Sequence, residues 1–145
     1  MKIPIILILL ALAGCAENSA DSNSKILVEQ IETALDGYAT EVSSNAPKFE
    51  LFLEQDALES AIQTQELVAS MGLIQLGQSY FFQTRLISMD QFETCLDVSG
   101  TSFVYENGDY FPIGERLERQ LVRAQFVERL SAVKISLLQM VGEPC

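Results

Sequence analysis

Apolar residues recur every three or four positions along much of this chain, which is the spacing of one face of an α-helix. The longest stretch covers residues 114–141 and predicts a central helix with one apolar stripe, made up of Val122, Phe126, Leu130, Val133, Leu137 and Val141. The same spacing predicts helices over residues 25–42 and 47–71. We therefore expect most of the chain to be helical.

Three further segments carry shorter patterns. Residues 89–98 follow a Ser-x-x-Gln capping-box pattern at residues 88–91, which predicts another helix. Residues 73–87 suit a helix or a strand, and we favour the helix because the neighbouring segments are predicted to be helical. Asn107-Gly108 lies between two aromatic-rich runs, which indicates either a β-hairpin or a plain loop between helices. The predicted fold is mainly α: a bundle of about four helices, with the option of this short hairpin.

The N-terminus follows a different pattern. Lys2 precedes an apolar run over residues 3–12 that is interrupted only by Pro4. A helix of this length spans about 15 Å, roughly half the hydrocarbon thickness of a bilayer. The run is too short to cross a membrane and is typical of a secretory signal peptide.

The four residues that end this segment, Leu12-Ala13-Gly14-Cys15, resemble the lipobox of bacterial lipoproteins. The resemblance implies that the Cys15 thiol is diacylglycerylated, that a peptidase removes residues 1–14, and that the new amino group receives an acyl chain such as palmitate. Ala16 stands where aspartate retains many lipoproteins in the inner membrane, so the resemblance implies an outer-membrane protein facing the periplasm. The inner membrane and the cell surface are the alternatives, and an ordinary secretory signal is the alternative to the lipobox.

The rest of the chain divides at residue 24. Residues 15–24 would form the lipidated cysteine and a flexible tether, because residues 16–24 contain no large apolar side chain. Residues 25–145 would form a single domain. Removing residues 1–14 takes away one lysine, so the formal charge of -11 becomes -12. Such an acidic chain is not expected to bind nucleic acid, whose phosphates need a basic surface.

The composition also limits the chemistry. The chain has no histidine, which excludes Ser-His and Cys-His nucleophile pairs and imidazole zinc sites. Four acidic residues invite a metal or acid–base interpretation, namely Glu50, Glu54, Asp56 and Glu59. Carboxylates near a helix N-terminus are more often favourable solvent-facing charges. We therefore expect no metal, no cofactor and no catalytic residue.

Two cysteines remain once Cys15 is assigned to the lipid. Cys95 and Cys145 form an even pair in a secreted, oxidising compartment, which favours a disulfide between them. Cys145 is the last residue, and a bridge would hold an end that otherwise frays. Two free thiols, or pairing with another chain through Cys145, are the alternatives.

Arginines gather near the start of the predicted last helix. Arg116, Arg119 and Arg123 would share one helical face and could form a stripe that recognises an anion or a partner. The alternative is a solvated face balanced by acids such as Glu115.

Aromatic residues gather around Asn107-Gly108. If the hairpin projects, Tyr105, Tyr110 and Phe111 would form an exposed contact patch. Packing in the core is the alternative for these side chains.

These observations favour a non-enzymatic binding or accessory protein of an envelope system, with another envelope protein as its partner. In size, anchor and bridge the chain resembles the small helical pilotins that escort secretin subunits to the outer membrane. A rival hypothesis is an envelope hydrolase that uses carboxylates such as Glu54 or Glu115.

Overall fold

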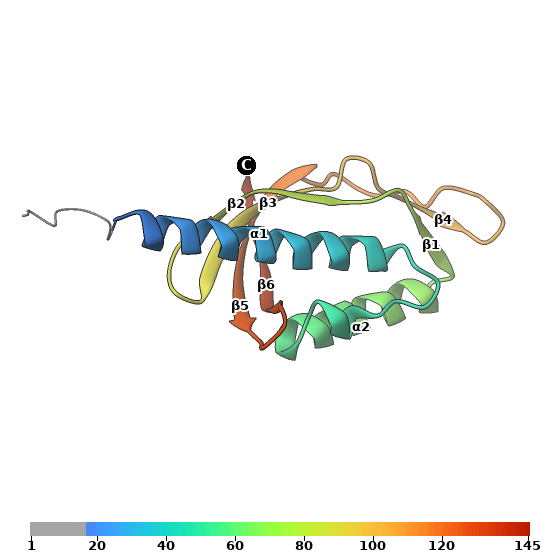
Figure 1. Cartoon of the computed structure of the whole chain (residues 1–145). Helices are drawn as coiled ribbons and strands as arrows, with labels where there is room; N and C mark the ends of the chain where they lie inside the picture. The colour runs from blue at the N-terminus through green and yellow to red at the C-terminus, as the bar shows by residue number, and fades with distance from the viewer. Residues whose placement is uncertain (1–16) are drawn as a thin grey trace, which may run out of the picture.

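The computed structural model describes residues 17–145, which adopt a mixed α/β fold (Figure 1). The elements follow in the order α1 (Glu17–Val42), η1 (Phe49–Leu51), α2 (Gln55–Ser70), β1 (Leu73–Leu76), β2 (Tyr80–Leu86), β3 (Gln91–Asp97), β4 (Ser102–Tyr105), β5 (Arg119–Glu128) and β6 (Val133–Pro144). No helix in this range is long and apolar enough to cross a membrane. The predicted lipidation site, Cys15, lies outside the described residues.

The strands form a four-stranded antiparallel sheet, in the order β2-β3-β5-β6, and a two-stranded sheet of β1 and β4. Both sheets contain parts of one long hairpin. Its first arm consists of β1 and β2, and its second, antiparallel arm consists of β3 and β4. Leu86 of β2 lies opposite Phe92 of β3 near the turn. Leu73 of β1 lies opposite Tyr105 of β4 at the far end.

The long hairpin bends between its two parts. Gly77 has a φ of +76°, and a Cβ there would lie 2.0 Å from the carbonyl oxygen of Gly100 on the returning strand. Only glycine allows both this conformation and this close approach. The Gln78 side-chain amide donates a hydrogen bond to the Thr40 hydroxyl (3.1 Å), which ties the bend to the C-terminal part of α1.

Both α-helices pack on the same face of the four-stranded sheet, as α1 crosses the strands in Figure 1. Ile31 and Leu35 of α1 are fully buried in one core cluster with Phe92, Phe126 and Ile135 of the sheet. Each large apolar side chain buried in this way stabilises the fold by about 1.5–3 kcal/mol. The opposite, outer face of the sheet carries no helix in the described part of the chain.

Backbone hydrogen bonds fix the start of α2 beside β6. Ile135 donates its N–H to the carbonyl of Phe52 and accepts from the N–H of Glu54, both at 2.9 Å. This contact covers the N-terminal part of the free edge of β6 and places α2 on the same side of the sheet as α1.

The predicted disulfide between Cys95 and Cys145 is confirmed, with a Cα–Cα distance of 5.9 Å. Cys95 is buried in β3, and Cys145 follows β6 directly. Because β5 separates β3 from β6, the last residue of the chain turns back across β5 on the outer face of the sheet. The bridge therefore locks the C-terminal strand to the middle of the sheet.

The predicted fold class, a mainly α bundle of about four helices, is wrong. The long helix expected over residues 114–141 is the β5–β6 hairpin. Val122 and Phe126 are four residues apart, which is about one turn of a helix but also two periods of a strand. Leu130 lies in the turn between the strands, where its side chain is exposed instead of buried.

Two further helix predictions are also wrong. Residues 89–98 lie largely in β3, and residues 73–87 form β1 and β2. Ser88 does not cap a helix: its hydroxyl bonds to Asp90 in the β2–β3 turn (3.2 Å). Aromatic residues in the run 80–82 fit the strand alternative, because they favour a half-buried pleated surface.

The predictions for the first two helices are confirmed in part. The helix over residues 25–42 is present in α1, but α1 begins at Glu17. Residues 17–24, expected to belong to a flexible tether, are therefore helical. Within residues 47–71, the α-helix begins at Gln55 and follows the short η1.

The hairpin alternative at Asn107-Gly108 is confirmed. The N–H of Gly108, which has a φ of +89°, donates to the carbonyl of Tyr105, and Tyr105 donates to the carbonyl of Asp109 (both 2.9 Å). Val104 forms an antiparallel bridge with Tyr110. This short hairpin extends beyond β4 at the end of the molecule farthest from the start of α1 (Figure 1).

Candidate binding cleft

The structure separates Arg116 from the other two arginines of the predicted stripe. Arg116 lies before β5 and donates to the backbone carbonyls of Val98 (2.8 Å) and Thr101 (2.6 Å). Arg119 and Arg123 belong to β5, not to a helix, and their even spacing places both on the outer face of the sheet.

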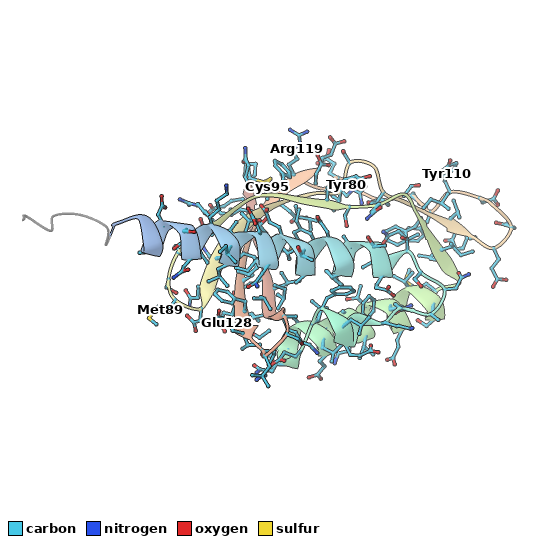
Figure 2. The ribbon with its side chains drawn as sticks, viewed as in Figure 1. Tyr80, Met89, Cys95, Tyr110, Arg119 and Glu128 are labelled. Atoms are coloured by element: carbon cyan, nitrogen blue, oxygen red, sulfur yellow. A yellow bond between two sulfur atoms is a disulfide. The ribbon has the colours of Figure 1, made fainter. Side chains whose placement is uncertain are left out.

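We call this surface the arginine face and define it by Arg85, Glu93, Asp97, Arg119 and Arg123. Glu93 in β3 lies between Arg85 of β2 and Arg123 of β5, and it bonds to both; the Arg123 Nε to Glu93 Oε1 distance is 3.0 Å. Arg119 Nε lies 2.9 Å from Asp97 Oδ2. Figure 2 shows Arg119 on this side, near Cys95. The two carboxylates are largely covered, and the three guanidinium groups reach into solvent.

These contacts hold both carboxylates in the ionised form. Hydrogen bonds from Arg123 and then from Arg85 lower the pKa of Glu93. Hydrogen bonds from the side chain and backbone of Ser99 lower the pKa of Asp97 to about 2. Two of the three guanidinium charges on the arginine face are therefore matched by carboxylates within the protein, which favours a structural role.

The predicted aromatic patch divides between two faces of the short hairpin. Tyr105 and Phe111 pack edge to face, with their ring centroids 5.9 Å apart. Tyr110 pairs with Val104 and so points to the other face. Its side chain is exposed and lies at the far end of the molecule in Figure 2.

The acidic candidates for a metal site are not brought together. Glu54 pairs with Arg129, with 2.9 Å between Glu54 Oε2 and Arg129 Nε, and this contact lowers the pKa of Glu54. No group of three His, Cys, Asp or Glu residues within 17–145 is placed to hold a metal ion. Glu50, Asp56 and Glu59 are exposed.

A cleft of about 360 Å³ lies between the C-terminal end of α1, α2 and β1. Its apolar lining includes buried or half-buried side chains from all three elements and their neighbours: Tyr38, Val42, Phe49, Ala61, Leu73 and Phe103. Its polar lining is uncharged and consists of Ser43, Ser44, Asn45, Thr64, Gln65 and Gln75. This size lies within the usual range of ligand pockets.

The cleft is electrically neutral in a strongly acidic protein. Among residues 17–145, none of those that line the cleft is charged, although charged residues make up 20% of the chain. Burial raises the pKa of the Tyr38 phenol, so this ring stays neutral at all ordinary pH values. A charged group entering the cleft would lose hydration without gaining an opposite charge. The cleft therefore favours an uncharged, apolar occupant.

One wall of the cleft is β1, a strand that has one unpaired edge within the described residues. The backbone N–H of Tyr105 donates a hydrogen bond to the segment 109–111, and the backbone carbonyl of Phe103 accepts one from the same segment. The backbone groups of these two residues therefore point away from β1, because neighbouring antiparallel residues alternate in hydrogen-bond direction. Leu73 lies opposite Tyr105 and Gln75 lies opposite Phe103, so their backbone N–H and C=O groups point away from β4, to the edge of β1 that pairs with no other strand within residues 17–145.

Comparison with known proteins adds information on the fold. No protein-family model matches this chain, and no curated protein sequence matches it either. The structure is similar to that of the intermembrane-space region of the chloroplast protein ARC6, with a TM-score of 0.51. The match covers 80% of this chain and 97% of that chain at 13% identity. At this identity the similarity shows the fold alone.

Sequence reasoning did not identify the cleft, and the available signals were weak. Gly72 and Gly77 flank a four-residue segment that would be long enough for a strand but was assigned to a helix. The uncharged stretch from Val42 to Pro47, rich in small polar residues, marks one side of the cleft. No pattern within one segment shows that these parts of the chain meet.

Proposed function

We propose that this protein is a lipid-anchored, non-enzymatic binding protein of the bacterial envelope. Cys15 anchors the chain in the outer membrane, with the domain facing the periplasm. The cleft binds an extended, uncharged and mainly apolar segment of another envelope protein. The segment adds to the free edge of β1 as a further strand.

The observation that carries this proposal is the position of the free strand edge. Leu73 and Gln75 line the cleft, and their outward backbone groups lie at the edge of β1 that has no strand partner among residues 17–145. An added strand gains affinity from main-chain hydrogen bonds and specificity from pockets for alternate side chains. The volume of about 360 Å³ suits a few apolar side chains of such a segment.

Two features support the proposed location. The sequence Leu12-Ala13-Gly14-Cys15 follows a short apolar run, as in bacterial lipoproteins. The Cys95–Cys145 bridge is typical of proteins in oxidising compartments such as the periplasm. Because the fold is mixed, the chain no longer resembles pilotins in being helical. The remaining likeness rests on its size, its proposed anchor and its disulfide bridge.

The surroundings of Glu54 argue against a role for this residue as the general acid of the rival hydrolase. A catalytic acid needs a raised pKa to stay protonated near neutral pH. Arg129 instead lowers the pKa of Glu54. Glu115 lies exposed in the segment before β5.

Peptide selection on the purified Cys15→Ser chain tests the cleft. Twelve-residue peptides displayed on phage would be selected, and the best would be labelled for affinity measurements. We expect uncharged, apolar sequences with β-branched or aromatic residues. Selection of acidic peptides would instead assign binding to the arginine face.

Two substitutions at one position separate backbone from side-chain recognition. Gln75→Pro removes the N–H that points away from β4, and it removes no bond to β4, since proline is tolerated on a free edge. We expect it to weaken peptide binding about tenfold. Gln75→Ala keeps the N–H and should bind nearly as the parent does. Equal loss in both variants would contradict strand addition.

The anchor has a separate test. The Cys15→Ser chain should appear in the soluble periplasmic fraction, whereas the parent chain should remain in the membrane fraction. Membrane association that does not change on this substitution would reject the lipid anchor.

A further inference from the structure

The start of α1 lies close to the proposed anchor. Glu17 is the second residue after Cys15, and two residues of extended chain span at most about 7 Å. If Cys15 carries acyl chains, the first turns of α1 must lie near the bilayer surface. This inference therefore rests on the proposed lipid anchor.

The β2–β3 turn, residues 87–90, lies at the same end of the molecule as the start of α1 (Figure 1). A shallow depression joins the two regions, and it is lined by residues 21–28 of α1 and residues 84–86 at the end of β2. The cleft and the short hairpin lie near the other end of α1. Since α1 has 26 residues, the two ends are about 39 Å apart.

The β2–β3 turn carries two exposed apolar side chains. Met89 is 95% exposed and Ile87 is 48% exposed. Figure 2 shows Met89 pointing away from the body of the protein. The backbone of the turn is held by its own hydrogen bonds, since Ile87 and Ser88 both donate to the carbonyl of Gln91 (2.9 and 3.3 Å). Neither apolar side chain is needed for this conformation.

The charges around the turn are more acidic than basic. Asp21, Asp90 and Glu128 lie beside the first turns of α1 or in the turn, against Lys25 and Arg85, and Arg85 is already paired with Glu93. A contact at this end would gain little from negatively charged lipid. It would depend on the apolar side chains, and burial of one large apolar side chain contributes about 1.5–3 kcal/mol.

We propose that Ile87 and Met89 insert into the headgroup region of the bilayer that holds the Cys15 lipid. The domain then has a second membrane contact, which fixes its orientation. The cleft lies at the end directed away from the bilayer, where a periplasmic partner reaches it.

The absence of tryptophan from the chain gives a direct test. The lipidated full-length protein with Met89→Trp, as its single tryptophan, is reconstituted into phosphatidylcholine vesicles that contain lipids brominated near the headgroup. Tyr110→Trp is the matched control, because Tyr110 is 72% exposed at the opposite end. We expect blue-shifted, strongly quenched emission from the M89W chain. The Y110W chain should show emission as in water, without quenching.

Flotation of the same vesicles distinguishes failure of the proposed lipid anchor from failure of the proposed second membrane contact. If both variants float and the M89W indole is no more quenched than the Y110W indole, the second contact is wrong and the anchor stands. If neither variant floats, the anchor is wrong and the second contact falls with it. Quenching that needs anionic lipid would contradict the proposed apolar contact.

A measurement on the unsubstituted chain excludes an effect of the tryptophan itself. Peroxide oxidises exposed methionines, and Met140 on β6, 51% exposed, is an internal reference in the same molecule. We expect the oxidation of Met89, relative to Met140, to slow several-fold in vesicles compared with detergent. An unchanged ratio would contradict insertion of the β2–β3 turn.

Discussion

The arginine face and the cleft are two surfaces of one small protein that handle polar groups in opposite ways. On the arginine face, Glu93 and Asp97 are each bonded to arginine from a neighbouring strand. In the cleft, no lining residue from the described part of the chain is charged, and the outward backbone groups of Leu73 and Gln75 have no strand from this part beside them.

The polar groups of the arginine face already have partners within the protein, whereas the outward backbone groups at the edge of β1 have none among residues 17–145. Cross-strand ion pairs hold the outer face of the sheet together and match two of its three arginine charges. The cleft offers apolar area and a free strand edge, which can be satisfied by another chain. We therefore assign stability to the arginine face and binding to the cleft, and each prediction below separates these two roles.

The largest effect is expected from the disulfide that crosses the outer face. Replacing Cys95 and Cys145 together by serine removes a loop constraint between residues 50 apart in sequence, worth about 4 kcal/mol in the chain-entropy model. Urea unfolding should show this loss in the free energy of unfolding. Affinity for a selected peptide, measured under conditions where the variant remains folded, should stay close to that of the parent. A large loss of affinity in the folded variant would mean that the two regions are coupled.

Filling the cleft should lower peptide affinity and leave stability almost unchanged. Ala69 lines the cleft from the exposed side of α2, so Ala69→Trp would occupy its mouth without entering the core. Peptide affinity should fall at least about tenfold, with little change in the thermal midpoint. Ser60→Trp on the same helix is a control, since Ser60 is exposed and does not line the cleft. Normal binding by the Ala69→Trp chain would place the binding site elsewhere.

Acid should weaken the fold through the ion-paired carboxylates. The pKa of Asp97 falls from 3.8 to about 2, and the pKa values of Glu54 and Glu93 are also lowered. Each carboxylate binds protons less readily when folded, so its stabilisation is complete above its ordinary pKa and is lost as the pH falls through the folded value. Urea midpoints should be steady near neutrality and should decrease mainly from about pH 4 to about pH 2. Combining Glu93→Gln and Asp97→Asn should flatten this decrease.

A smaller effect is expected from Glu93 alone. Glu93→Gln keeps the shape of the side chain but leaves Arg85 and Arg123 without the carboxylate between them. The thermal midpoint should fall by about 2–5 °C, with unchanged peptide affinity. Glu115→Gln, at an exposed position, should change neither quantity. Weaker binding in the Glu93→Gln chain would give the arginine face a direct role in recognition.

The sequence predicted some elements because their signals are local. Residues 25–42 have a regular helical stripe, and the turn at Asn107-Gly108 has a specific backbone requirement that glycine meets at φ +89°. The Cys95–Cys145 pair followed from counting cysteines in a secreted chain. Each of these inferences depends on a few neighbouring residues or on composition.

The strands were mistaken for helices because spacing by four fits both structures. Val122 and Phe126 lie on one face in either case, and only the partner strand decides between them. The arginine face shows the same ambiguity: Arg119 and Arg123 do share a surface, but on a strand. Arg85 joins them only through the pairing of β2 with β3. The cleft depends on contacts between α1, α2 and β1, which no local pattern specifies.

Amide hydrogen exchange with a selected peptide tests the central claim most directly. Exchange would be followed by NMR for each residue of the Cys15→Ser chain, with and without saturating peptide. We predict that the amides of Leu73 and Gln75 become strongly protected, because they donate to the added strand, while those of Arg119 and Arg123 do not change. Protection of β5 or of the outer face, with unchanged exchange at Leu73 and Gln75, would contradict the account.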